Sequence, residues 1–433
     1  MSMELTRRQS LHWFLALSAV LASSGLAACS DGPRVRAPEP PDDLLLAGSE
    51  VARSPGSADA TPDAVASVSA LAGGLYDALA VEPGNLAFSP YSVAVALAMT
   101  LNGARGETAA EMRQVLHARD LGSLNGGLTA LTLHLEGLAG RRITLDTANA
   151  LFGQRDTRWQ QPFLDDLARY YGAGMRLVDY RLAAEAARDL INGWTARQTH
   201  DRIPEIVPPG VLDALTRLVL VNALYLKAPW SEPFEREATR RRPFVTDTGR
   251  TVAADMMTAG LESARWGAGD GWEAVRVAYA GGQLAMTVVL PAEGRLDDVS
   301  AAVAAGGLTE ILAATRRGGV RLSLPRWRFR TRTPLDDVLR GLGMRAAFDE
   351  RAADFRGMTR QERLCVSTVL HEAFIAVDEE GTEAAAATAV VMRTVSAPLL
   401  EHEVVVDRPF LFVVHDVAHL TPLFVGRVTD PTA

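Results

Sequence analysis

Residues 378–396, which read DEEGTEAAAATAVVMRTVS, constrain the fold more than any other segment of this 433-residue chain. The segment begins as a run of small residues and ends in β-branched ones. In a β-strand, successive side chains point to opposite faces. One face would then be uncharged and would hold Thr382, Ala384, Ala386, Thr388, Val390, Met392 and Thr394. The opposite face would hold Glu383 and Arg393, on the side that can meet water.

This alternation predicts a segment that can enter a β-sheet as a one-sided strand. Gly381 stands at its head, where a backbone hinge needs the conformational freedom that a Cβ would deny. The alternative is an exposed alanine-rich helix, because alanine is the best helix former. The valines and threonines from Thr388 onward favour the strand.

Five ordered segments resemble conserved parts of the serpin family. The reactive-loop hinge of inhibitory serpins resembles Glu379, Glu380, Gly381, Thr382, Glu383, Ala384, Ala385, Ala386, Ala387 and Thr388. The family's shutter segment resembles residues 85–93 with 101–108, which include Ser89 and Ser92. Residues 220–230, which contain Asn222, resemble the strand that ends at the breach tryptophan, here Trp230. Residues 371–378 begin with His371 and resemble the strand before the hinge, and residues 407–410 with 424–428 resemble the C-terminal signature.

The resemblance implies an α+β serpin fold, with large mixed or antiparallel sheets surrounded by helices and an exposed reactive loop. It implies a single serpin domain over residues 62–433. The residues themselves indicate the same class. Apolar residues at helical spacing predict a helix over 63–79, and Ser89 with Pro90 predicts the start of another. We expect strands over 219–226, 285–290, 320–329, 374–377 and 410–414.

The N-terminus is typical of a targeting segment. Arg7 and Arg8 precede an apolar run of about 16 residues, and the sequence LAAC at 26–29 resembles a bacterial lipobox. We expect residues 1–28 to be a signal peptide that is cleaved before Cys29, with lipid on the Cys29 thiol. A retained transmembrane helix is the alternative, although the run is short for a bilayer.

Residues 29–61 are rich in Pro, Ala, Ser and Asp and are predicted to be a disordered tether. The protein would then lie in a bacterial cell envelope, periplasmic or surface-exposed, and would contact membrane only through its lipid. Cys365 would have no disulfide partner and is expected to be a small buried residue.

Composition and motifs exclude several classes of function. The net charge of −8 gives no general attraction to nucleic acid or anionic lipid. The chain contains no Gly-x-Ser-x-Gly elbow, His-Glu-x-x-His motif, phosphate loop or paired-cysteine spacing. We therefore expect a monomer that is not an enzyme and that has no cofactor and no metal site.

The resemblance implies a serine protease inhibitor that acts as a suicide substrate. Counting fourteen residues on from Gly381 places the reactive bond between Val395 and Ser396. An aliphatic Val395 suits elastase-, subtilisin- or chymotrypsin-like proteases, which would form a covalent acyl complex with the chain. Arg393 would favour trypsin-like proteases if the loop register were shorter. Papain-like cysteine proteases are a further target class, and a non-inhibitory carrier or scaffold is the alternative function.

Ser89, Ser92, Asn222 and His371 correspond to the family's shutter, and Trp230 to its breach. From the residues alone, Ser89 is a helix cap. Asn222 and His371 are polar residues in apolar strands whose hydrogen bonds any neighbour could satisfy, and Trp230 is a large core residue.

One basic row remains. Arg326, Arg328, Arg330 and Arg332 alternate with Trp327 and Phe329, so a strand there would have a basic face and an aromatic face. With Arg316, Arg317 and Arg321 this face could bind a polyanion. Such a row is more often a solvated strand face.

Overall fold

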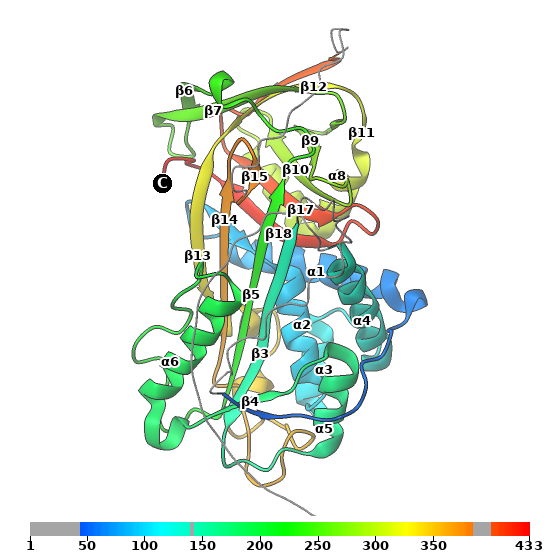
Figure 1. Cartoon of the computed structure of the whole chain (residues 1–433), viewed down its shortest axis with the longest axis vertical. Helices are drawn as coiled ribbons and strands as arrows, with labels where there is room; N and C mark the ends of the chain where they lie inside the picture. Colours follow the sequence, from blue (N-terminus) through cyan, green and yellow to red (C-terminus); the bar gives the residue numbers. More distant parts are fainter. Residues whose placement is uncertain (1–43, 139–142, 384–399) are drawn as a thin grey trace, which may run out of the picture. The chain divides into compact units, whose positions relative to one another are not determined.

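The computed structural model describes residues 44–138, 143–383 and 400–433. Within them three β-sheets and nine α-helices form one unit, with layers of helix against sheet (Figure 1). This is the predicted α+β architecture.

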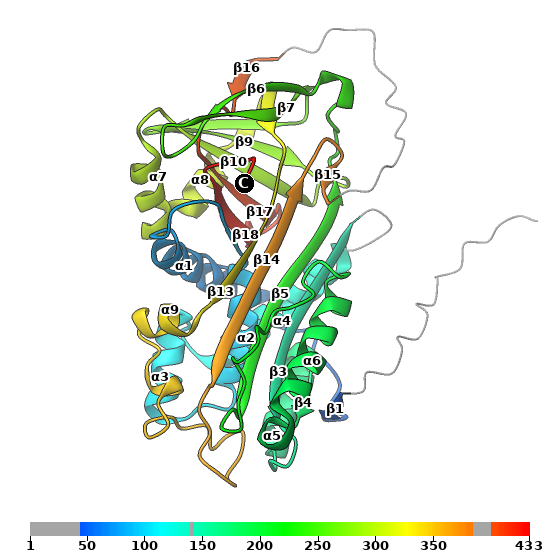
Figure 2. The same ribbon diagram turned by 90° about the vertical axis from the view of Figure 1, so that its left-hand side faces the viewer.

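Sheet A holds the longest strands and contains most of the residues singled out by the sequence. Its strand order is β1 (Leu45–Ala47), β4 (Met175–Val178), β3 (Thr144–Gln154), β5 (Leu218–Pro229), β15 (Gly381–Thr382), β14 (Thr368–Val377) and β13 (Trp327–Pro334). β5 and β14 are parallel to each other, whereas β3 is antiparallel to β5 and β13 is antiparallel to β14. Figure 2 shows the four long strands side by side.

The other two sheets complete the β-structure. Sheet B has the order β11 (Arg316–Arg317), β8 (Arg265–Gly269), β9 (Trp272–Ala278), β10 (Leu284–Pro291), β17 (Phe410–Asp416), β18 (Pro422–Val428) and β2 (Leu86–Phe88). Sheet C has the order β16 (His402–Val405), β12 (Val320–Pro325), β7 (Thr251–Leu261) and β6 (Arg240–Val245).

The α-helices of the described residues surround the three sheets. They are α1 (Thr61–Leu79), α2 (Pro90–Leu101), α3 (Gly106–Val115), α4 (Leu121–Leu138), α5 (Gln161–Asp166), α6 (Tyr180–Gln198), α7 (Leu296–Ala302), α8 (Leu308–Ala314) and α9 (Asp336–Gly341). α6 lies along one face of sheet A, where Ile191 and Trp194 pack on Val219 and Val221 of β5 (Figure 2). The opposite face packs on α1, α2 and sheet B in the larger core.

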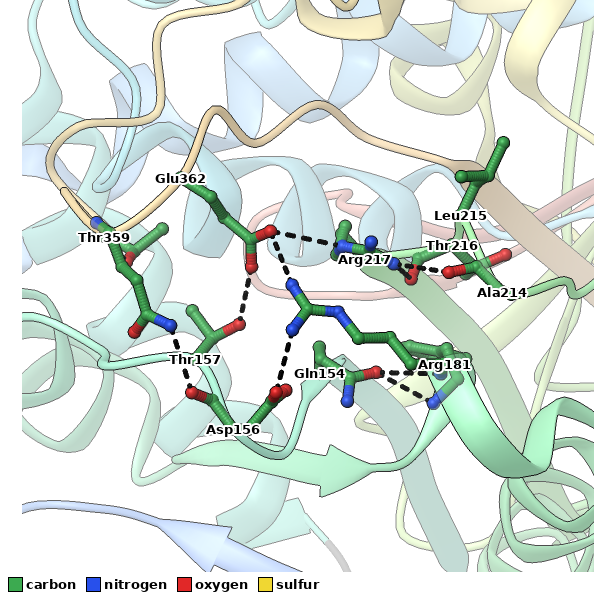
Figure 3. A network of polar contacts seen from close by, with 12 residues as sticks. Gln154, Asp156, Thr157, Arg181, Ala214, Leu215, Thr216, Arg217, Thr359 and Glu362 are labelled. Atoms are coloured by element: carbon green, nitrogen blue, oxygen red, sulfur yellow. Dashed lines mark hydrogen bonds and ion pairs between the residues drawn. The ribbon is translucent and has the colours of Figure 1, made fainter.

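A polar network holds the N-terminal end of α6 against the lower end of sheet A (Figure 3). The Arg181 guanidinium pairs with Asp156 at 2.8 Å and with Glu362 at 2.7 Å. Glu362 also accepts from Arg217, just before β5, and from Thr157. The network therefore joins α6, β5 and the segment before β14.

Most of the predicted elements are confirmed. The helix expected over 63–79 is α1, which begins two residues earlier at Thr61. Ser89 caps α2, since its Oγ accepts from the Ser92 N–H at 3.1 Å. The strands expected over 219–226, 285–290, 374–377 and 410–414 lie within β5, β10, β14 and β17.

Two predictions about the chain's organisation do not hold. The single strand expected over 320–329 is two strands, β12 in sheet C and β13 in sheet A, because the chain leaves one sheet for the other after Pro325. Residues 44–61 are not a disordered tether. β1 pairs antiparallel with β4, and the Ser57 N–H donates to the Gly126 carbonyl at 2.8 Å.

Main-chain pairing of this kind needs no hydrophobic period, so composition could not reveal it. Residues 1–43, which include the expected signal peptide and Cys29, lie outside the described residues. Among the described residues, no helix is long and apolar enough to span a bilayer.

Candidate functional site

The head of the predicted loop already occupies a place in sheet A. Gly381 and Thr382 form β15, which lies between the upper ends of β5 and β14 (Figure 2). Thr382 is opposite Ala228 on one side and Val377 on the other, antiparallel to both strands. A Cβ on Gly381 would lie 2.1 Å from the Ala228 carbonyl oxygen, so only glycine fits there.

Residues 378–380, which precede β15, are held by contacts with residues that follow β5. The Trp230 indole N–H donates to the Asp378 carbonyl at 3.0 Å, and the Trp230 amide donates to the Glu380 carbonyl at 2.8 Å. The Glu379 carboxylate is buried and accepts from the Thr239 hydroxyl at 2.7 Å. Trp230 is thus a contact of the hinge as well as a core residue.

Asp378 closes the turn into the hinge, because its carboxylate accepts from the amides of Glu380 and Gly381. Burial raises the pKa of the Asp378 carboxyl, and the two amide hydrogen bonds oppose that shift.

The two hinge residues at the edge of the described structure, Thr382 and Glu383, make different contacts. Thr382 is buried and faces sheet B, where its hydroxyl lies 2.5 Å from the Tyr279 hydroxyl. Glu383 points to the opposite face and pairs with Arg202. Burial raises the pKa of the Glu383 carboxyl, and Arg202 opposes that shift. Glu383 lies just beyond β15 and has a left-handed φ of 49°, so its direction is set by a turn of the backbone, and the predicted alternation along the loop stays a prediction.

β5 and β14 pair with each other only below β15. β5 and β14 pair directly from Val219 with Thr368 to Leu224 with Ala373. No direct pairing of β5 with β14 is found above that point, and a surface cleft of about 890 Å³ lies beside them and reaches sheet C and the C-terminus. Tyr225 and Lys227 of β5 and Phe374 of β14 line it. The hinge therefore lies between β5 and β14 just above the level at which these strands pair directly.

The residues predicted to form the shutter meet where β5 and β14 are still paired. Asn222 and His371 are opposite each other in the ladder, and His371 Nδ1 lies 2.5 Å from Asn222 Oδ1. The Ser89 amide donates to His371 Nε2 at 3.0 Å. Since Nε2 accepts, Nδ1 carries the proton and donates to Asn222. Full burial lowers the pKa of His371 to about 4, so the ring is neutral.

Among the described residues, Ser92 makes no hydrogen bond with His371. Its hydroxyl donates to Asn149 Oδ1 at 2.6 Å, and Asn149 is opposite Asn222 in the β3–β5 ladder. The structure thus adds Asn149 to the shutter, together with Tyr279 and Arg202 at the hinge. Only a polar residue in an apolar strand could have indicated Asn149, and no sequence signal indicated the other two.

The basic row on β13 is mostly paired. Arg330 and Arg332 contact the buried carboxylate of Glu372 at 3.0 and 2.9 Å, and Arg326 lies 3.7 Å from Glu379. Arg328 stacks over the Phe374 ring at 5.4 Å. Burial raises the pKa of Glu372, and the two arginines oppose that shift. These contacts favour a charge-paired strand face. Arg316, Arg317 and Arg321 belong to the other two sheets.

The remaining predicted site residues lie outside the described residues. They are Cys29, the hinge residues Ala384, Ala385, Ala386, Ala387 and Thr388, the alternative contact Arg393, and the reactive bond Val395–Ser396. Cys365 is half-buried and has no disulfide partner in the described part of the chain, and burial raises its pKa.

Sequence comparisons agree with this geometry. A family model described as Serpin (serine protease inhibitor) matches residues 66–431. An uncharacterised serpin-like protein from Thermococcus kodakarensis is 39% identical over 362 residues, which cover 82% of this chain and 83% of that protein. Leukocyte elastase inhibitor A from Mus musculus is 34% identical over 358 residues, with 80% and 93% covered.

Solved structures share the fold. Tengpin, a thermophilic serpin solved in its native state, superposes with a TM-score of 0.76 at 26% identity and covers 84% of this chain and 94% of its own. Human thyroxine-binding globulin in complex with its hormone superposes with a TM-score of 0.77 at 26% identity, covering 86% and 100%. With the family model spanning nearly all of sheets A, B and C, the chain belongs to the serpin family.

Proposed function

We propose that this serpin inhibits serine proteases as a suicide substrate, by inserting its cleaved loop between β5 and β14. The observation that carries the proposal is the position of β15, which lies between β5 and β14 and pairs antiparallel with both. Attack on Val395 would form an acyl-enzyme on its carbonyl. The freed loop would then extend β15 downward and carry the protease with it.

The strand register supports full insertion. β5 and β14 are parallel, so a strand antiparallel to both keeps the same register against each. Thr388 is six residues after Thr382, and it would reach the positions six residues before Ala228 and Val377. Those positions are Asn222 and His371, the pair that closes the sheet. Insertion would therefore separate this pair and place the Thr388 hydroxyl between its two side chains.

Energetics favour the inserted state once the loop is cut. Every inserted residue gains backbone hydrogen bonds to strands on either side, worth about 1 kcal/mol each net. The core-facing side chains Thr382, Ala384, Ala386 and Thr388 are small enough to fit against α2 and sheet B without a buried charge. The uncleaved protein would then be kinetically trapped above its inserted form.

Target choice depends on the reactive bond. We place it at Val395–Ser396, which suits elastase-, subtilisin- or chymotrypsin-like enzymes, and one relative is named leukocyte elastase inhibitor A. Trypsin-like specificity through Arg393, and papain-like proteases, are alternatives. A carrier function is the second candidate, since human thyroxine-binding globulin shares the fold.

A panel of elastase, subtilisin, trypsin and papain tests the proposal. We expect a detergent-stable covalent complex with elastase or subtilisin, with cleavage after Val395 identified by mass spectrometry. Thr382→Arg should convert inhibitor into substrate, because insertion would bury an unpaired charge beside Tyr279 at a cost of several kcal/mol. Thr382→Val, of similar size and uncharged, is the matched control and should retain the complex. A stable complex at full stoichiometry with Thr382→Arg would refute insertion.

Anchoring is a separate part of the proposal. We propose that the signal peptide is cleaved before Cys29 and that Cys29 carries lipid, so that the inhibitor is anchored in a bacterial cell envelope, either periplasmic or surface-exposed. Labelling with a radioactive fatty acid should mark the wild type and leave Cys29→Ser unlabelled. The inhibitory proposal does not depend on this result.

A further inference from the structure

Two histidines and a buried aspartate meet on the side of the molecule where α4 packs near sheet B. His134 belongs to α4, Asp416 ends β17, and His419 lies in the turn to β18. One ligand atom from each of these three side chains lies within 4.8 Å of the other two. His134 and Asp416 are 282 positions apart in the chain, so no motif spacing could reveal this cluster.

The distances suit a small divalent ion. Asp416 Oδ2 lies 3.7 Å from His134 Nε2 and 3.1 Å from His419 Nδ1. Ligands about 2.0–2.1 Å from a tetrahedral zinc ion are separated by about 3.4 Å, so these two separations bracket the required value. The two rings meet edge to face, with centroids 4.9 Å apart. Small rotations of the half-exposed imidazoles would bring both nitrogens to bonding distance.

The carboxylate is already held in place by the turn. Asp416 is fully buried, and its Oδ1 accepts from the Thr421 amide at 2.8 Å. Its Oδ2 accepts from the His419 amide at 2.8 Å and faces both imidazoles. Backbone donors of this kind orient a ligating carboxylate, as outer-shell partners do in metal sites. In the described part of the chain, the ion pairs of Asp416 involve only His134 and His419.

We propose that His134, Asp416 and His419 bind a divalent transition-metal ion, with Zn²⁺ the best fit. Two imidazoles and one carboxylate are a common zinc ligand set, with water in the fourth position. Zn²⁺ would bind through the unprotonated His134 Nε2 and His419 Nδ1. Binding through His419 Nδ1 requires the neutral tautomer that carries its proton on Nε2. The bound ion would join α4 to the β17–β18 turn and stabilise the folded chain by mass action.

Calorimetric titration of the full chain with Zn²⁺, without a histidine tag, tests the site. We expect one ion per chain and a melting temperature that rises with the Zn²⁺ concentration. Either His134→Gln or His419→Gln should weaken binding at least tenfold and abolish the thermal shift. Co²⁺ should show the visible absorption of a four- or five-coordinate site in the wild type and lose it in both variants.

His200→Gln is the matched control. His200 also pairs with an aspartate, Asp146, at 2.8 Å, but at the surface and outside the three-residue cluster. It should bind Zn²⁺ as the wild type does. Circular dichroism and the metal-free melting temperature show whether each variant is folded, and the two histidine variants test the site independently. Absence of one-to-one binding in the wild type, or unchanged binding in both variants, would overturn the proposal.

Discussion

Replacing Gly381 by alanine tests whether the hinge is seated in sheet A as described. An alanine Cβ would lie 2.1 Å from the Ala228 carbonyl oxygen and 2.6 Å from the Pro229 Cα. Both are backbone atoms of a central strand, so the hinge must move instead. We expect Gly381→Ala to expel β15 from between β5 and β14.

The cost follows from the contacts that hold the turn and β15. The backbone bonds include Trp230 N–H to the Glu380 carbonyl, Asp378 N–H to the Gly381 carbonyl and Glu383 N–H to the Ala376 carbonyl. The Thr382–Tyr279 hydroxyl contact would also be lost. At about 1 kcal/mol for each bond, expulsion should destabilise the native protein by about 3–4 kcal/mol. Inhibition should also fall, because the same clash opposes the inserted state.

Urea denaturation followed by tryptophan fluorescence measures the loss of stability and reports whether the hinge has left its place beside Trp230. Trp230 is buried against Tyr279 and bonded to the hinge, so its emission should shift to the red in Gly381→Ala. Gly341→Ala is the matched control. It is the last residue of α9, with open space around its Cβ position, and should be neutral or stabilising by up to about 1 kcal/mol. If Gly381→Ala matches the wild type in stability and emission, the register of β15 is wrong.

Two further predictions concern the shutter and α6. His371 has a pKa of about 4 in the folded protein against 6.5 for an ordinary histidine. As the pH falls, His371 is therefore protonated in the unfolded chain at a higher pH than in the folded protein. The contribution of the neutral His371 to the free energy of unfolding is therefore complete above pH 6.5 and falls by about 3 kcal/mol as the pH drops to 4. His371→Gln should not show this loss when urea midpoints are measured across that range. The other titrating groups are common to both proteins, so parallel pH profiles would contradict the assignment of a neutral His371. Arg181→Met should cost about 1 kcal/mol, because its pairs with Asp156 and Glu362 are partly exposed. Its effect should be non-additive with Glu362→Gln in a double-mutant cycle, and simple additivity would argue against the network in Figure 3.

The sequence predicts local features of the fold well for physical reasons. The strands expected within β5, β10, β14 and β17 follow from short apolar, β-branched runs. The α1 helix and the cap at Ser89 follow from local periodicity and from the hydrogen-bonding chemistry of serine. These features depend on neighbours within a few residues of each other.

What the sequence misses depends on distant segments meeting in space. Asn149 and Tyr279 join the shutter and hinge from other strands, and the chain near them carries no distinctive pattern. The segment from residue 44 is held by backbone pairing at an edge of sheet A and by side-chain contacts such as Ser49 with Asp165, which join segments far apart in the chain. The histidine cluster of α4 and the β17–β18 turn is likewise a product of the fold.

Melting temperatures before and after cleavage in the loop test the central claim most directly, which is that the cut strand enters sheet A. Insertion of about ten residues, with backbone bonds on both sides, should raise the melting temperature by more than about 10 °C. The same cleavage in Thr382→Arg should give no such rise. A wild-type protein whose melting temperature is unchanged or lower after cleavage would contradict insertion, whatever the fold.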